Sequence, residues 1–289
     1  MKINILGIMN PMFNTEEKDI PSIIHQAYKL EDTDTNLKDA PTGNQKLQNH
    51  IRQYCGTIGG ECYSTDGMPV LASQPREKAF VRADNCANGG HLSVFGHFVA
   101  TLELVGISKA MCMLLNNNHI NNTSERSMRY TNMKNACTAE DLRLYDKWKE
   151  IFLNKINETY GKKYPEIFTK SLITKKANEN ARYIISSYYK TRMVYTNDVR
   201  EFTYISRTID YVLTLGDEMP PFLKGMKEEL IEFNTLLKGT GLVFDAFNDQ
   251  REKAFSLLSK NNKVIKPYYG DCIADTYKMS LSCTAQLQR

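Results

Sequence analysis

The sequence predicts a mixed α+β fold, in which helices flank a twisted, mainly antiparallel sheet. Residues 2 to 8, KINILGI, are rich in isoleucine, as strands are. Residues 95 to 107, FGHFVATLELVGI, alternate aromatic or β-branched residues with small or polar ones, the pattern of a half-buried strand. Helical patterns dominate from residue 139 onward. With 289 residues, of which 42% are hydrophobic and 24% charged, the chain can bury a sizeable core.

The chain shows no internal repeat, and we expect a single domain over residues 1–289 with a less readable C-terminal extension at 240–289. The polar segment 29–44 predicts a loop, and a helix is expected at 45–54. The glycine-rich stretch CGTIGGE at 55–61 lacks the lysine and the strand-to-helix setting of a phosphate-binding loop. We interpret it as a flexible turn.

An amphipathic helix is expected at 139–161, where apolar residues recur at spacings of three and four. Thr138 is its expected cap, with Asp141 three residues later in the acceptor position. The strand ending near 107 is expected to lead directly into a site loop at 114–130. Further helices are predicted at about 166–189, 198–213 and 220–241, the last with prolines at its start and glycines at its end.

Composition narrows the classes of function. The net charge of +4 suits a small anionic ligand but not the strong basic stripe of a protein that binds nucleic-acid polymers. The N-terminus lacks the features of a leader peptide, and no window approaches the roughly 18 apolar residues of a membrane span. The seven cysteines form no CxxC pair and no zinc spacing with the five histidines. We therefore expect a cytoplasmic protein with reduced thiols, no metal and no membrane contact.

The segment 114–132, LLNNNHINNTSERSMRYTN, concentrates polar groups after an apolar run. Between Ser124 and Tyr130 it offers hydroxyl donors, one carboxylate and two guanidiniums that can fork onto a phosphate or carboxylate. This inventory suits an anionic ligand such as a nucleotide. A solvated loop followed by an exposed, capped helix start would also explain it.

The block from His91 to Tyr130 resembles the central part of the flavin-dependent thymidylate synthases. In that family a His-x-Ser-x-x-Glu-His segment leads to Arg-His-Arg-x-x-Ser-x-Asn-Glu-x-Ser-x-Arg-Tyr. Gly96 stands here in place of the glutamate. The matching residues are His91, Ser93 and His97 in the first segment, and Glu125, Ser127, Arg129 and Tyr130 in the second.

A second block, ENARYIISSYYKTRMVYTNDVREF at 179–202, resembles the family's Glu-x-Ala-Arg-x-x-Leu-Pro segment and its later Asn-x-Arg element. Glu179 and Arg182 align directly, whereas Asn197 and Arg200 have one residue too many between them. Because the two blocks occur in the family's order and at plausible spacing, together they are more specific than either alone.

The main departure from the family lies at its Arg-His-Arg triplet, which is replaced by Asn117, Asn118 and His119. The family's arginines help to hold the flavin, and neutral amides cannot form charge-assisted bonds, which are worth about 1.5–3 kcal/mol each. FAD binding is therefore expected to be weakened or rebuilt, with Lys109 or a basic residue of a neighbouring subunit as the replacement cation. The expected cofactor residues are His97, Asn117, Asn118, His119 and Asn197.

The resemblance implies reductive transfer of a one-carbon unit, a methylation, to C5 of a uridine nucleotide such as dUMP. It also implies FAD, methylenetetrahydrofolate and NADPH as cofactors, and a homotetramer. Ser127, which orients the substrate, and His119, a candidate base, are the expected catalytic residues. A related C5 modification such as hydroxymethylation, and a non-catalytic nucleotide-binding homologue that has lost flavin, remain as alternatives. The expected substrate residues are Glu125, Ser127, Arg129, Arg182 and Arg200.

Overall fold

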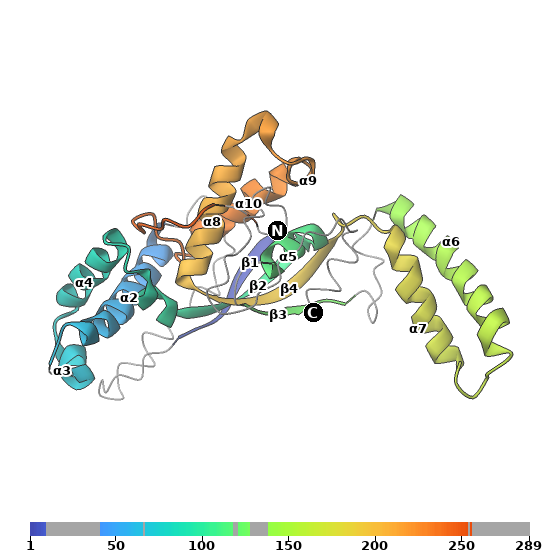
Figure 1. Cartoon of the computed structure of the whole chain (residues 1–289), viewed down its shortest axis with the longest axis horizontal. Coiled ribbons are helices and arrows are strands. Elements are labelled where there is room, and N and C mark those ends of the chain that lie inside the picture. The colour runs from blue at the N-terminus through green and yellow to red at the C-terminus, as the bar shows by residue number, and fades with distance from the viewer. Residues whose placement is uncertain (10–40, 66, 118–120, 128–137, 254, 256–289) are drawn as a thin grey trace, which may run out of the picture. The chain divides into compact units, whose positions relative to one another are not determined.

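A four-stranded sheet with the strand order β1-β2-β4-β3 is flanked by helices in the computed structural model (Figure 1). The sheet is antiparallel, so the predicted fold class is confirmed. The structure describes residues 1–9, 41–65, 67–117, 121–127, 138–253 and 255. The strands are β1 at Lys2–Ile8, β2 at Val99–Ser108, β3 at Asn122–Glu125 and β4 at Lys190–Asp198.

Two of these strands test the sequence patterns directly. β1 coincides with the predicted strand at residues 2–8. β2 begins later than expected, because residues Leu92–His97 form a 3-10 helix, η3, before the chain becomes extended. No strand was predicted at β4, although alternate residues of KTRMVYTND are buried along it, as a period of two requires.

The chain divides into two compact units. Unit 1 comprises Met1–Leu104, His119–Thr123 and Val194–Ala254. Unit 2 comprises Val105–Asn118, Ser124–Met193 and Phe255–Arg289. The expectation of a single domain with an extension at 240–289 stays a prediction.

Unit 1 contains two pairs of packed helices, α2 with α4 and α8 with α10, and η3 contacts both α2 and α8. The predicted helix at 198–213 is confirmed as α8. The one predicted at 220–241 is two helices, because the helix is interrupted at Gly225 and Met226. The helices of unit 1 are α2 (Pro41–Gly59), η2 (Gly60–Cys62), α3 (Gly67–Ser73), α4 (Arg76–Asn88), η3, α8 (Val199–Thr214), η6 (Gly216–Glu218), α9 (Pro221–Lys224) and α10 (Lys227–Gly239).

The glycine-rich stretch at 55–61 is helical, so its interpretation as a flexible turn is wrong. Helix α2 begins at Pro41, inside the predicted loop, and runs through Gly59. A Cβ atom added at Gly56 would lie 1.9 Å from the carbonyl oxygen of Ala79 in α4. The missing side chain thus lets the two helix backbones approach closely.

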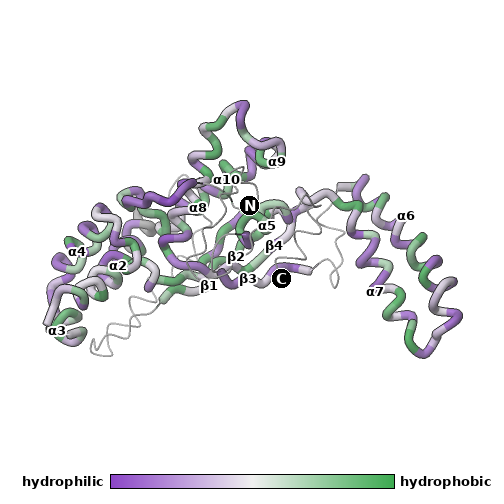
Figure 2. The backbone as a smooth tube through the Cα atoms, in the orientation of Figure 1, coloured by the Kyte–Doolittle hydropathy of each residue, from purple (hydrophilic) through white to green (hydrophobic). Residues whose placement is uncertain are grey.

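Unit 2 contains α5 at Lys109–Asn116, which follows β2 at once. The Ser108 hydroxyl caps α5 by accepting a hydrogen bond from the Met111 amide at 3.0 Å. All residues from Ala110 to Leu115 are buried, as expected for the MCMLL run, and Figure 2 shows α5 among the hydrophobic segments. The strand therefore does not lead directly into a site loop at 114–130, because α5 intervenes and 122–125 is itself a strand.

A helical hairpin, whose two helices pack on each other, forms another part of unit 2. Its first helix, α6 at Ala139–Ile156, has the predicted cap, since Thr138 and Asp141 form a reciprocal capping box. The second predicted helix, 166–189, is shorter than expected, because only Lys170–Ala181 is α-helical and a 3-10 helix follows it. The hairpin continues with η4 (Asn157–Gly161), α7 (Lys170–Ala181) and η5 (Arg182–Ile184). None of the described helices combines the length and apolar character needed to cross a membrane.

Candidate functional site

In unit 1, the first group of candidate residues lies at the start of α8. Asp198 is the N-cap, and its Oδ1 accepts a hydrogen bond from the amide of Glu201 at 3.0 Å. Its Oδ2 accepts one from Arg200 Nη2 at 2.7 Å. The Asp198 side chain is 14% exposed and that of Arg200 36% exposed. One carboxylate therefore fixes both the helix end and the guanidinium.

The Arg200 guanidinium lies against the backbone of Gly96. A Cβ atom at Gly96 would be 2.6 Å from Nη2 of Arg200, 2.7 Å from Cζ and 2.8 Å from Nε. A glutamate at this position, as in the resembling family, would require Arg200 to move. The amide of Val199 also donates to the carbonyl of Phe98 at 3.1 Å. The structure thus brings the first motif, which ends at His97, into contact with the Asn197–Arg200 element.

Asn197 and His97 differ in how they are held. Asn197 is buried, donates from Nδ2 to the hydroxyl of Tyr195 at 3.0 Å, and accepts from the amide of Asp198 at 2.9 Å. Burial raises the pKa of Tyr195 more than the hydrogen bond from Asn197 lowers it, so this phenol stays protonated. His97 is exposed at the end of η3. The assignment of both residues to a cofactor stays a prediction.

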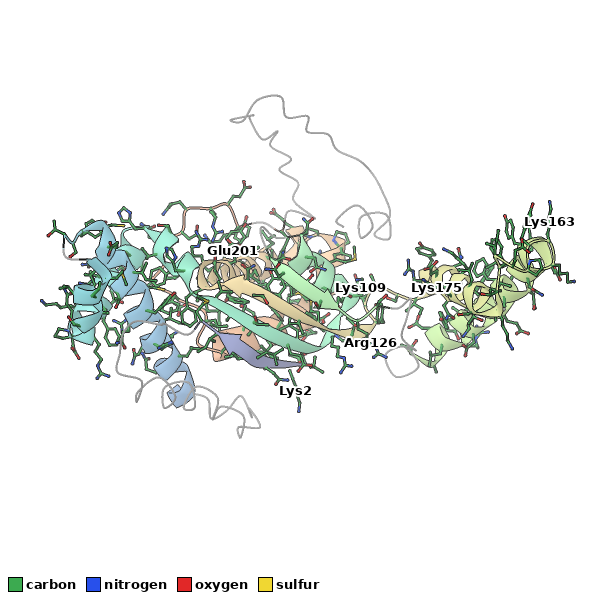
Figure 3. The ribbon with its side chains drawn as sticks, turned by 90° about the horizontal axis from the view of Figure 1, so that it is seen from below. Lys2, Lys109, Arg126, Lys163, Lys175 and Glu201 are labelled. Atoms are coloured by element: carbon green, nitrogen blue, oxygen red, sulfur yellow. The ribbon has the colours of Figure 1, made fainter. Side chains whose placement is uncertain are left out.

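A polar cluster next to this group was not predicted from the sequence. Glu201 (Figure 3) is buried, and its carboxylate pairs with Arg251. Arg251 also donates to Asp249 at 2.7 Å and stacks 4.2 Å over the ring of Tyr204. Burial alone would lower the pKa of Arg251, but the hydrogen bonds with Asp249 and Glu201 raise it, so the guanidinium stays charged.

The sequence carries a signal for only one part of this cluster. The spacing Asp198-x-x-Glu201 before an apolar helix is an N-cap pattern and could have been recognised. Arg251 is fifty residues from Glu201, and no local pattern connects them.

In unit 2, the second group centres on a bidentate ion pair between Lys109 and Glu125. Lys109 Nζ donates to Oε1 of Glu125 at 2.7 Å and to Oε2 at 2.6 Å. The side chains are 25% and 13% exposed, respectively. Lys109 (Figure 3) is the first residue of α5, and its amide donates to the carbonyl of Tyr189 at 3.1 Å. Glu125 at the end of β3 is therefore neutralised by a cation from the same unit.

The remaining candidates of unit 2 are distributed over its elements. Ser127 is half-buried just after β3, where the amide of Arg126 donates to the carbonyl of Arg192 at 3.1 Å. Asn117 is the C-cap of α5. Arg182 caps α7, and its guanidinium lies 5.3 Å from the centre of the Tyr183 ring. A cation at a helix C-terminus is also favoured by the helix dipole, so the position of Arg182 suits a structural role as well as a ligand role.

Three predicted site residues, Asn118, His119 and Arg129, lie outside the described residues. The described residues contain no group of three or more His, Cys, Asp or Glu side chains that could hold a metal ion. The positions of the described site residues do not test the roles assigned to them, so all the site assignments stay predictions.

Residues 46–208, more than half of the chain, match the family model described as thymidylate synthase complementing protein. One similar solved structure is flavin dependent thymidylate synthase ThyX from Helicobacter pylori complexed with FAD and dUMP, at 16% identity and a TM-score of 0.40 over 68% of this chain and 95% of that one. A second structure of Helicobacter pylori ThyX with FAD and dUMP is 19% identical, with a TM-score of 0.34 over 63% and 94%. No curated protein matches the chain. All the sequence-predicted site residues lie inside the matched range.

Proposed function

Since the chain belongs to the thymidylate synthase complementing proteins, the family of flavin-dependent thymidylate synthases, we propose that it transfers a one-carbon unit reductively to C5 of a uridine nucleotide such as dUMP. The product expected from the family's reaction is the C5-methylated nucleotide. A hydroxymethylated product is the related alternative.

The observation that carries this proposal is the contact between two motif elements far apart in sequence. Gly96 and Arg200 touch, and Val199 bonds to Phe98, so the first and last elements of the family pattern form one local structure. Arg200 uses Nη2 for Asp198 and keeps about a third of its side chain exposed. An anchored, partly exposed guanidinium suits a phosphate or a pyrimidine carbonyl, since its direction is set before the ligand arrives.

The ion pair in unit 2 fits the same substrate class. A lone carboxylate would repel an anionic nucleotide, but Lys109 neutralises Glu125 while leaving its oxygens able to accept hydrogen bonds. Under the proposal, Glu125 and Ser127 orient the nucleotide, and Arg129, Arg182 and Arg200 bind its phosphate and base. Ser127 acts by positioning, and His119 is the candidate base.

The family's reaction uses FAD, methylenetetrahydrofolate and NADPH, and the described residues fit FAD poorly. The described part of the altered triplet, Asn117, offers a neutral amide where the family has a guanidinium. Lys109, the expected replacement cation, is held by both oxygens of Glu125. A flavin diphosphate would therefore need cations from elsewhere, for example from another subunit of the expected homotetramer.

Titration calorimetry with dUMP tests the proposal. We expect the wild type to bind, and Arg182→Gln and Arg200→Gln each to weaken binding about tenfold to a hundredfold, as the loss of a charge-assisted contact should. Arg207→Gln, which changes a guanidinium of α8 that bonds to the Asp245 carbonyl, is the matched control. Absence of dUMP binding in the wild type would refute the proposed substrate.

A second candidate is a nucleotide-binding homologue that has lost flavin and turnover, and the engaged Lys109 together with the neutral Asn117 favours it. The visible absorption spectrum of the purified protein, with and without added FAD, separates the two. A flavin band supports the enzyme. If the band and FAD binding are absent but appear when Asn117 and Asn118 are both replaced by arginine, the non-catalytic role holds.

The cytoplasmic location and the homotetramer also stay predictions. Sedimentation of the purified chain, with and without FAD, measures the assembly directly.

A further inference from the structure

We propose that Arg251 is a positioning residue that holds Arg200 in place for the nucleotide. The inference rests on the proposed function, because it takes Arg200 as a nucleotide contact. Arg251 lies outside residues 46–208, the range that matches the family model. It therefore belongs to none of the motif elements described above.

Arg251 is attached to the first turn of α8 at two points. Its Nη1 pairs with Glu201 Oε1, and its Nη2 lies 3.4 Å from the backbone carbonyl of Arg200. Asp249 orients the guanidinium for these contacts, because its Oδ2 accepts hydrogen bonds from Nε at 3.0 Å and from Nη2 at 2.7 Å. The ring of Tyr204 supports it from one face.

The first turn of α8 transmits this anchoring to the side chain of Arg200. Asp198 bonds both the amide of Glu201 and the guanidinium of Arg200, so a shift of Glu201 moves the carboxylate that holds Arg200. Within the described residues, Nε of Arg200 is buried without a hydrogen-bond partner. The direction of the guanidinium thus depends on Asp198 and on contact with Gly96, and both require the turn to stay in place.

A merely structural role would predict a different pattern. Residues 242–253 also contact α8 through Arg207, whose Nη2 donates to the carbonyl of Asp245 at 2.7 Å. This bond fastens the same segment to the same helix but reaches neither Glu201 nor the Arg200 carbonyl. If Arg251 only fastened the segment, Arg207→Gln and Arg251→Gln would behave alike.

A double-mutant cycle with dUMP, measured by titration calorimetry, tests the positioning role. We expect Arg251→Gln to weaken binding about tenfold, and Arg207→Gln to leave the affinity unchanged. If Arg251 acts through Arg200, the variant Arg200→Gln/Arg251→Gln should bind no more weakly than Arg200→Gln alone. Multiplicative losses in the double variant, or equal losses in Arg207→Gln and Arg251→Gln, would overturn the inference.

Hydrogen exchange supplies a readout that needs no nucleotide. In Arg251→Gln, amides at the start of α8, including that of Glu201, should exchange faster, whereas in Arg207→Gln they should keep wild-type rates. If the wild type fails to bind dUMP, the proposed function fails, and exchange alone decides whether Arg251 holds this turn. Unchanged exchange in Arg251→Gln would overturn the positioning role whatever the binding result.

Discussion

The substitution Gly96→Ala should displace the guanidinium of Arg200. A Cβ atom would lie 2.6 Å from Nη2 of Arg200, whereas ordinary contacts begin near 3.4 Å. The guanidinium must therefore withdraw by about 0.8 Å or more. A displacement of this size along the bond to Asp198 would lengthen it from 2.7 Å to about 3.5 Å, the limit of a hydrogen bond.

The energetic cost follows from the bond that is lost. A charge-assisted hydrogen bond contributes about 1.5–3 kcal/mol, and the 36% exposure of Arg200 reduces the expected cost to about 1 kcal/mol. Urea denaturation measures this loss in the free energy of unfolding. Under the proposed function, dUMP affinity should also fall about tenfold, because the guanidinium loses its direction.

The background variant Arg200→Ala is the control for this prediction. Removing the guanidinium removes the three atoms that lie nearest to a methyl group at Gly96, so Gly96→Ala should cost much less in that background. An equal cost in both backgrounds would show that the alanine acts on the backbone of η3 and would refute the reasoning.

Three further perturbations have expected outcomes. Lys109→Met leaves the largely buried Glu125 carboxylate without its cation. In urea denaturation this variant should lower the free energy of unfolding by about 2 kcal/mol. Lys109→Arg, which keeps a cation at this position, should retain most of the wild-type stability. Gly56→Ala places a methyl group 1.9 Å from a carbonyl oxygen of α4 and should destabilise by about 3 kcal/mol; a neutral effect in calorimetry would contradict the close helix crossing. Burial raises the pKa of Asp249, but the hydrogen bonds from Arg251 lower it by more, so the pKa of this carboxyl lies below its ordinary value. The ionised Asp249 carboxylate therefore stabilises the fold fully above about pH 4, and this stabilisation is lost as the pH falls through the lowered pKa. Asp249→Asn should thus have a lower free energy of unfolding than wild type at neutral pH and the same one in strong acid.

Local patterns predicted the elements whose structure depends on local contacts. The capping box of Thr138 and Asp141, the strand at residues 2–8 and the buried MCMLL run each follow from neighbouring residues. The same reasoning was wrong for CGTIGGE, because glycines that indicate a turn in isolation here allow two helices to cross. Helix propensity accounts for the destabilising effect of a glycine inside a helix. The close packing that offsets this effect depends on the neighbouring helix, which local sequence does not identify.

In the candidate site, too, local motifs could be predicted and contacts between distant residues could not. The resemblance identified Arg200 from its motif, but its setting depends on Gly96 and Arg251, which are about a hundred and about fifty residues away in the sequence. The Lys109–Glu125 pair joins a helix start to a strand end, and the sequence alone suggested Lys109 for a different partner. Pairings between distant side chains depend on tertiary packing and leave no periodic signal.

The strand order has a consequence for the synthesis of the protein. β2 pairs with β4, and the bonded hydroxyls of Thr101 and Thr196 belong to residues 95 positions apart. At a translation rate of about 5–20 residues per second, β2 waits roughly 5–20 s for its partner to be made. The α6–α7 hairpin lies between them in sequence and can form from local contacts within microseconds. One edge of β2, a strand whose Ala100, Leu102 and Leu104 are buried in the folded protein, is thus unpaired on the ribosome. We therefore expect the yield of folded protein to depend on chaperones.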